Sequence, residues 1–222
     1  MTSEQVRDPH TDRLLTPQNA VVVIIDYQPV QVASIDSMDR QLLVDNIVGV
    51  AKIARAYDVP VVHSTVNVQT GLNKPAIPQL RDVVSDLPTY DRTSINAWED
   101  REFKDAVKAT GRNKIVMAAL WTEACMAFPT LDALADGFDV YPVADAMGGT
   151  SLSAHETALR RVEQAGAQPI TWVQLLCELQ RDWNRHDTAQ RFMELFIETG
   201  GTPGLQFAND LDVSSGSNGG SG

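Results

Sequence analysis

A continuous run of apolar, mostly β-branched residues near the N-terminus constrains the fold more than any other feature. Residues 20–26 read AVVVIID, with no polar side chain before Asp26. A strand with one solvated face alternates apolar and polar residues, whereas a strand of a parallel sheet is covered on both faces and is apolar throughout. The run therefore predicts a central strand of a parallel sheet, and with it an α/β fold.

Strand-like and helix-like segments alternate along the rest of the chain. We expect further strands at residues 59–65, 114–120, 138–144 and 168–172. The predicted helices span residues 42–57, 99–110, 123–136, 153–164, 173–183 and 188–199. Repeated strand–helix units joined by right-handed crossovers predict a three-layer α/β/α sandwich around a mostly parallel open sheet.

The two ends differ in composition from this central part. We interpret residues 1–17 as a polar N-terminal arm, residues 18–200 as one domain and residues 201–222 as a C-terminal extension. Within the extension, residues 214–222 read SSGSNGGSG, which is typical of a flexible linker or tag.

The net charge and the number of cysteines limit which partners the protein can bind and in which cellular compartment we expect it. A formal net charge of −11 argues against nucleic acid or an anionic membrane surface as a partner, because both require clustered Lys and Arg. No apolar run approaches the roughly 20 residues of a membrane span, and the N-terminus has no apolar signal core. Two cysteines are too few for a disulfide framework. We expect a soluble, cytoplasmic protein that acts on a small molecule.

Two chemically capable side chains follow predicted strands. Asp26 ends the first strand, and Cys125 lies between the strand at 114–120 and the start of a helix. Ligands of parallel α/β sheets bind at the carboxyl ends of the strands, so these residues are expected to meet. A thiol at such a turn faces the positive end of a helix dipole, which should lower its pKa. A neighbouring carboxylate can take the thiol proton and deliver it to a leaving amine.

Arg92, in the polar segment TYDRTSINAW, is the candidate cation that would hold the carboxylate. Each candidate also has a structural interpretation. Asp26 fits a helix N-cap, Cys125 a small buried hydrophobe, and Arg92 a surface charge paired with Asp91. Cys177 lies mid-helix among leucines, and we predict that it belongs to the core.

Several longer motifs carry a family resemblance. They are DYQ after the first strand, RTSINAWED, ALWTEACMAFPTLDALADGFDVYPVADAMGG and AGAQPITWVQLLCELQRDW. Together they resemble the isochorismatase-like cysteine hydrolases, most closely the YcaC-like branch, over residues 18–195. The resemblance implies Cys125 as nucleophile, Asp26 as general base and Arg92 as the basic third member. It also implies an oxyanion hole from the backbone N–H groups of Trp121 and Cys125, and a non-proline cis peptide at Trp121–Thr122.

The sequence departs from the wider family at Arg92, where lysine is usual. Arginine stays charged and cannot shuttle a proton, but it can orient Asp26 through a bidentate contact. The metal-binding Asp/His cluster of the nicotinamidase branch has no match. His63 is interpreted as a buried strand histidine, and His10, His155 and His186 as surface residues. We expect no metal and no cofactor.

Substrate contacts and assembly are further expectations. Asn96, Trp98 and Phe128 are candidate pocket residues near the thiol. The resemblance implies a homo-oligomer, a tetramer or an octamer. The apolar helix that carries Phe192, Met193, Leu195 and Phe196 is a candidate interface, although packing on its own domain would explain it equally well.

Three hypotheses for function follow. The first is a cofactor-free hydrolase that cleaves an amide-type C–N bond through a thioester. The second is a vinyl-ether hydrolase of the isochorismatase type, in which Asp26 acts as an acid without a covalent step. The third is a non-catalytic oligomeric scaffold whose site has drifted, as the replacement of lysine by Arg92 would allow.

Overall fold

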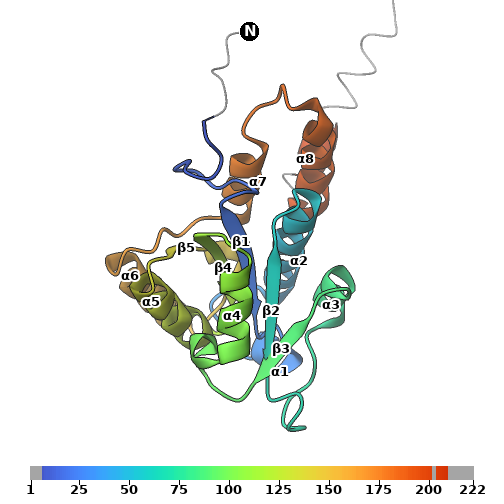
Figure 1. Ribbon diagram of the computed structural model, residues 1–222. Coiled ribbons are helices and arrows are strands. Elements are labelled where there is room, and N and C mark those ends of the chain that lie inside the picture. The colour runs from blue at the N-terminus through green and yellow to red at the C-terminus, as the bar shows by residue number, and fades with distance from the viewer. Residues whose placement is uncertain (1–6, 202–203, 210–222) are drawn as a thin grey trace, which may run out of the picture.

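The computed structural model describes residues 7–201 and 204–209, arranged around one parallel sheet (Figure 1). The strands are β1 (Ala20–Ile25), β2 (Val61–Val66), β3 (Thr89–Arg92), β4 (Lys114–Ala119) and β5 (Asp139–Pro142). Their order across the sheet is β3-β2-β1-β4-β5, and every pair is parallel. The apolar run near the N-terminus is thus the central strand, as predicted.

Both edges of the sheet differ from the prediction. The segment 168–172, expected to be a fifth strand, contributes one isolated bridge, between Ile170 and Val143. The sheet nevertheless has five strands, because β3 is a strand that we did not predict. It lies in the polar segment that carries Arg92. β3 is short and only its last residue is buried, so it lacks the apolar run that identifies a central strand.

Helices cover both faces of the sheet, which confirms the three-layer sandwich. One face carries α2 (Arg40–Ala56), α3 (Pro78–Val84), α7 (Trp172–Gln180) and α8 (His186–Thr199). The other carries α4 (Arg101–Ala109), α5 (Ala127–Ala135) and α6 (Leu152–Gln164). Shorter elements are α1 (Pro29–Ala33), η1 (Ala97–Glu99), η2 (Thr122–Met126) and η3 (Ala144–Ala146).

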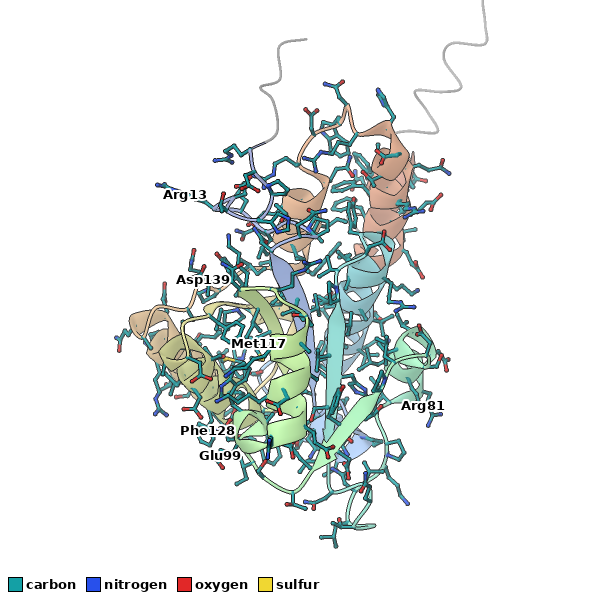
Figure 2. All side chains as sticks on the ribbon, viewed as in Figure 1. Arg13, Arg81, Glu99, Met117, Phe128 and Asp139 are labelled. Carbon is teal, nitrogen blue, oxygen red and sulfur yellow. The ribbon has the colours of Figure 1, made fainter. Side chains whose placement is uncertain are left out.

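Successive residues of β1 explain why its sequence is apolar throughout. Val22 and Ile24 pack with the α2 side, and Val21 and Val23 pack with the α4 and α5 side. Successive side chains of a strand point to opposite faces, so a central strand needs apolar residues at every position. Met117 of β4 likewise lies against the α4 side (Figure 2).

The chain ends pack against this body where they are described. The ammonium of Lys114 donates to the carbonyl oxygens of Asp12, Arg13 and Leu14 at 2.6, 2.7 and 3.2 Å, and Leu15 is fully buried. This part of the predicted arm is therefore anchored to the start of β4. The predicted linker at 214–222 lies outside the described residues.

The prediction that Cys177 belongs to the core is wrong, because its side chain is exposed on α7. Leu175 and Leu179 occupy the buried side of that helix. A residue two positions away from each is rotated by about 200° around the helix axis and faces outward. On α8, Phe192 and Leu195 are buried within their own domain, against α2 and α7.

No helix in the described part of the chain is long and apolar enough to cross a bilayer.

Candidate active site

Three of the predicted site residues meet at the carboxyl edge of the sheet. Asp26 follows β1, Arg92 is the last residue of β3, and Cys125 lies in η2 after β4. The chain winds outward from β1 to β3 in one direction and from β4 to β5 in the other. The site therefore lies where the strand order reverses, the position at which open parallel sheets bind ligands.

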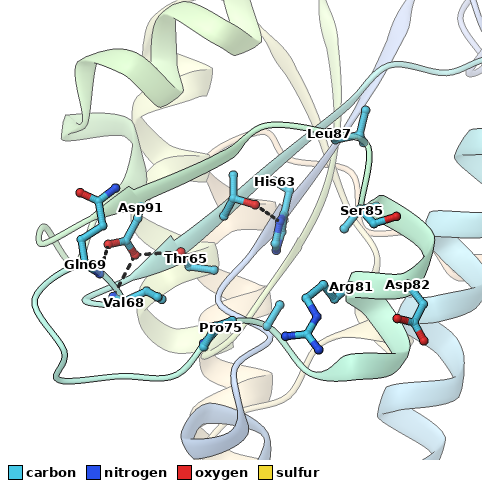
Figure 3. A pocket seen from close by; sticks show the side chains of 13 residues that line it. His63, Thr65, Val68, Gln69, Pro75, Arg81, Asp82, Ser85, Leu87 and Asp91 are labelled. Carbon is cyan, nitrogen blue, oxygen red and sulfur yellow. Dashed lines mark hydrogen bonds between the residues drawn. The ribbon is translucent and has the colours of Figure 1, made fainter.

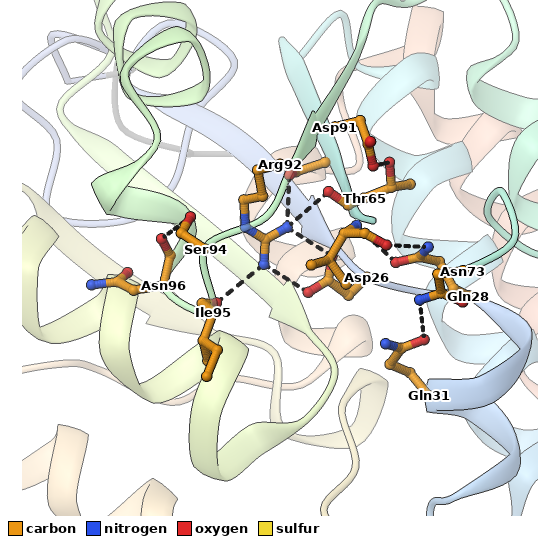
Figure 4. Close-up of polar contacts among 12 residues, drawn as sticks. Asp26, Gln28, Gln31, Thr65, Asn73, Asp91, Arg92, Ser94, Ile95 and Asn96 are labelled. Atoms are coloured by element: carbon orange, nitrogen blue, oxygen red, sulfur yellow. Dashed lines mark hydrogen bonds and ion pairs between the residues drawn. The ribbon is translucent and has the colours of Figure 1, made fainter. Parts of the chain in front are cut away.

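Asp26 and Arg92 form a bidentate ion pair (Figure 4). The Nη1 and Nη2 atoms of Arg92 donate to Oδ1 and Oδ2 of Asp26 at 2.8 and 2.7 Å. Both side chains are almost completely excluded from solvent. Burial by itself disfavours the charged guanidinium, but the hydrogen bonds and charge of Asp26 outweigh this and raise the pKa of Arg92. Arg92 therefore remains a cation in this buried pair.

Further contacts hold the guanidinium in place. Nη1 also donates to the hydroxyl of Ser64 at 3.0 Å and to the carbonyl oxygen of Thr65 at 3.1 Å. Nη2 donates to the carbonyl oxygen of Ile95 at 3.2 Å. The neighbouring Asp91 is not paired with Arg92 in this way. It accepts from the hydroxyl of Thr65 and anchors the loop that follows β2.

Cys125 is buried, and its thiol lies beside the Asp26 carboxylate of the ion pair. Burial, followed by the charge of Asp26 and its polar contact with the thiol, raises the pKa of Cys125 to about 12. The nearby guanidinium of Arg92 and the N–H of Trp121 oppose the shift but do not reverse it. The expectation of a lowered pKa is therefore wrong for the resting site, since burial and a carboxylate outweigh the helix terminus. At rest Cys125 is therefore a neutral thiol that keeps its proton beside the Asp26 carboxylate.

The backbone around Cys125 departs from a regular helix. Residues Thr122–Met126 form a π-helical turn in which the N–H of Met126 donates to the carbonyl oxygen of Trp121 at 3.1 Å. Such turns occur frequently at functional sites. The cis peptide joins Leu120 to Trp121, one bond earlier than the predicted Trp121–Thr122. The N–H of Trp121 lies near enough to the predicted nucleophile to oppose the rise in the pKa of the Cys125 thiol.

Thr122 links this turn to α6. Its N–H donates to the carbonyl oxygen of Gly148 at 2.9 Å, and its hydroxyl lies 2.8 Å from Nδ1 of His155. His155 is half-buried rather than a surface residue as predicted, and burial lowers its pKa. The polar residues around His155 in the sequence did not indicate its contact with Thr122, because Thr122 lies 33 residues away along the chain.

Gln28 is a structural residue of the site that the sequence analysis missed. Its side chain is fully buried and makes three hydrogen bonds to the backbone of the loop after β2. It accepts from the N–H of Val66 at 2.9 Å and donates to the carbonyl oxygens of Val66 and Lys74 at 3.0 and 2.6 Å. The sequence feature that could have identified Gln28 is its position in the DYQ motif, two residues after Asp26.

The predicted pocket residues lie on the α4 and α5 side. Asn96 donates to Asp132 at 2.7 Å and accepts from the N–H of Trp98, so both ends of its amide have partners within the chain. Trp98 packs in the same cluster as Cys125, and Phe128 packs against that cluster. The two aromatic residues thus belong to the same side of the sheet as the thiol, and Asn96 caps η1.

The histidines and acidic residues of the described part form no group of three that could hold a metal ion. His63 is buried in β2, as predicted, and His10 and His186 are exposed, as predicted.

Residues 20–174 match the isochorismatase domain family, and the chain belongs to this family. The parallel α/β sandwich described above, with Asp26, Arg92 and Cys125 at the strand-order reversal, is therefore the isochorismatase-like hydrolase fold. Among characterised sequences, the chain is 36% identical over 170 residues to "Probable hydrolase YcaC" of Escherichia coli, covering 76% of this chain and 81% of that protein.

Solved structures agree with this placement. YcaC from Pseudomonas aeruginosa, described with hexane-2,5-diol and covalent acrylamide, superposes with a TM-score of 0.84 at 31% identity. The Escherichia coli YcaC structure, described as an octameric hydrolase of unknown specificity, gives a TM-score of 0.84 at 32% identity. Each comparison covers 91% of this chain and 98% of the other.

Proposed function

We propose that this chain is a cofactor-free cysteine hydrolase that cleaves an amide-type C–N bond of a small molecule through a thioester. The proposal rests on the position of the Cys125 thiol beside the Asp26 carboxylate, which Arg92 clamps through two hydrogen bonds. A neutral thiol held against a fixed carboxylate has its general base in place before substrate arrives.

The reaction begins when Asp26 accepts the thiol proton as the sulfur attacks the substrate carbonyl carbon. The developing oxyanion is held by the N–H groups of Trp121 and Cys125, a contribution of about 3–4 kcal/mol for one such donor. Asp26 then gives the proton to the leaving amine, and the C–N bond breaks. A water molecule, deprotonated by Asp26, hydrolyses the thioester and restores the thiol.

Arg92 has an electrostatic role in this scheme. Because it remains a cation, it neither donates nor accepts a proton during turnover. It holds the plane of the Asp26 carboxylate and offsets negative charge in a buried site. Trp98 and Phe128 supply apolar walls near the thiol, which suits a small planar substrate.

The two alternatives account for less of the site. Vinyl-ether hydrolysis with Asp26 as the acid needs no cysteine, although the Cys125 thiol lies beside that side chain. A non-catalytic scaffold would not need Asp26, Arg92 and Cys125 to be held together in one buried site. We also propose that the chain assembles into a homo-oligomer, with the octamer of the related Escherichia coli protein as the reference.

The test is a turnover screen over small amides, ureides and carbamoyl compounds. Cys125→Ala is expected to abolish turnover, and Cys177→Ser, the matched control at the other cysteine, to retain it. Intact-mass spectrometry during turnover should detect an acyl adduct on wild type that Cys125→Ala lacks. Normal turnover by Cys125→Ala would rule out nucleophilic catalysis by this residue.

Acrylamide provides a second readout that does not need the substrate. A related protein holds this electrophile covalently. We expect acrylamide to alkylate Cys125 faster than the more exposed Cys177, because Asp26 removes the proton as the sulfur adds. Faster labelling of Cys177 would contradict activation by Asp26.

A further inference from the structure

A cavity of about 460 Å³ lies between α3 and the strands β2 and β3 (Figure 3). Its wall contains none of Asp26, Arg92 and Cys125. Arg92 and Ser64 face the α4 side of these strands, whereas the alternate residues His63 and Asp91 face the cavity. The cavity is therefore separated from the proposed active site by the sheet itself.

The cavity contains a buried polar group that lacks a partner. His63 is only 3% exposed, and its Nε2 atom makes no hydrogen bond with any described residue. Its Nδ1 atom lies 3.4 Å from the hydroxyl of Thr89. The other end of the ring points away from Thr89, toward Pro75 and Arg81 (Figure 3). A buried nitrogen without a partner is rare in folded proteins, and a bound molecule can supply the missing hydrogen bond.

The protonation state of the His63 ring determines whether a ligand must supply a hydrogen-bond donor or an acceptor. Burial lowers the pKa of His63 to about 4, so the ring is neutral near pH 7. When the hydroxyl of Thr89 donates to Nδ1, the ring proton lies on Nε2. His63 then presents a hydrogen-bond donor to the cavity and needs an acceptor.

Arg81 adds a cation at the edge of the cavity. It projects from α3 at the surface (Figure 2), and no ion pair joins it to an acidic residue in the part of the chain that the structure describes. The cavity also contains two carboxylates. Asp91 already accepts from Thr65 and from two backbone N–H groups, and Asp82 points away from His63 (Figure 3).

We propose that this cavity is a second small-molecule site, which binds a small carboxylate with an apolar body. The carboxylate accepts from Nε2 of His63 and pairs with Arg81, while the apolar body contacts the remaining wall. The apolar part of that wall consists of Val68, Pro75, Ala76, Val84 and Leu87, and Thr65, Gln69, Ser85 and Thr89 also line the cavity. The volume lies within the range of small-molecule pockets.

Benzoate tests the proposal, with benzyl alcohol as the uncharged analogue. Binding is measured by calorimetry and by saturation-transfer NMR on wild type and on Cys125→Ser. Benzoate should bind both proteins equally, and benzyl alcohol at least about tenfold more weakly, as loss of a charged hydrogen bond implies. Arg81→Gln should weaken benzoate binding by a similar factor, and Arg101→Gln, an exposed arginine on α4, should not change it.

His63 is tested separately. His63→Leu should weaken benzoate binding and His63→Gln should restore part of it, because the glutamine amide can still donate. Should His63→Leu not fold, the Arg81 variants and the imidazole ¹⁵N shifts of wild type remain decisive. Those shifts should place the proton on Nε2.

Four results of the binding and NMR measurements would overturn the proposal. They are the absence of saturable benzoate binding at millimolar concentration, binding that Arg81→Gln leaves unchanged, binding that Cys125→Ser abolishes, and a ring proton on Nδ1. A change in oligomer mass on Arg81→Gln would likewise overturn it, by showing that the cavity is a contact between copies. Binding is measured without turnover, so these results are independent of the hydrolase proposal.

Discussion

Arg92 reaches across a whole strand to clamp Asp26. Arg92 ends β3 and Asp26 follows β1, and these strands are not neighbours in the sheet, because β2 lies between them. The guanidinium spans this gap and contacts Ser64 and Thr65 of β2 on the way. One side chain thus ties three strand ends together and fixes the carboxylate that contacts Cys125.

Removing the cation should therefore cost both stability and activity. Arg92→Leu leaves Asp26 buried without a counter-ion, and we expect a loss of about 3–5 kcal/mol in the free energy of unfolding. Arg92→Lys keeps the charge but cannot make the bidentate contact, so it should lose less stability and still turn over slowly. Urea unfolding measures the loss of stability, and steady-state rates measure the loss of activity.

Arg101→Gln is the control, because it removes an exposed ion pair and should stay within about 0.5 kcal/mol of wild type in unfolding free energy. An Arg92→Leu variant as stable as this control would contradict the argument.

Cys125 should make the fold sensitive to alkaline pH. The folded protein keeps the thiol proton up to about pH 12, whereas the unfolded chain releases it near its ordinary pKa of 9.0. The unfolded state is therefore favoured as the pH rises above 9, by about 1–2 kcal/mol at pH 10.5. The quantity to measure is the difference in unfolding free energy between wild type and Cys125→Ala at each pH, which cancels the other titrating groups. A difference that stays constant from pH 8 to 10.5 would show that the thiol is not held protonated.

His63 should have the opposite effect at acidic pH. The buried ring stays neutral down to about pH 4, but in the unfolded chain it takes up a proton near 6.5. Stability should therefore fall as the pH drops below 6.5, by about 2 kcal/mol at pH 5 from this residue alone. His63→Gln is expected to lack that part of the loss, and His186→Gln, at an exposed histidine, to retain it. Equal slopes for both variants would mean that His63 is accessible to protons.

Gln28 should hold the loop after β2 in place. Gln28→Met has a similar shape but leaves the backbone groups of Val66 and Lys74 without partners, at a cost of about 2–4 kcal/mol. Amide exchange at Val66 and limited proteolysis within residues 67–74 should both accelerate. Gln31→Met is the control, since Gln31 accepts a single longer bond from Asn73. Unchanged proteolysis in Gln28→Met would show that the loop is held by other contacts.

The parallel sheet and the residues that end its strands could be predicted from local pattern. The central strand was identifiable because burial on both faces demands an unbroken apolar run, and β1 and β4 both have one. β3 was missed because an edge strand is only partly buried, so polar residues such as Asp91 are tolerated in it. Cys177 was misplaced because a leucine-rich helix was treated as apolar on all sides, although only one side packs.

What the sequence by itself determined is the set of reactive groups and the edge of the sheet at which they lie. Asp26, Arg92 and Cys125 follow or end strands, and parallel strands place their carboxyl ends together. Only the tertiary structure decided the state of these groups. The elevated pKa of Cys125, the bidentate clamp of Arg92 and the unsatisfied nitrogen of His63 depend on burial and on partners far apart along the chain. Desolvation and charge pairing are set by the distance between atoms in the folded protein, and residue order does not contain that distance.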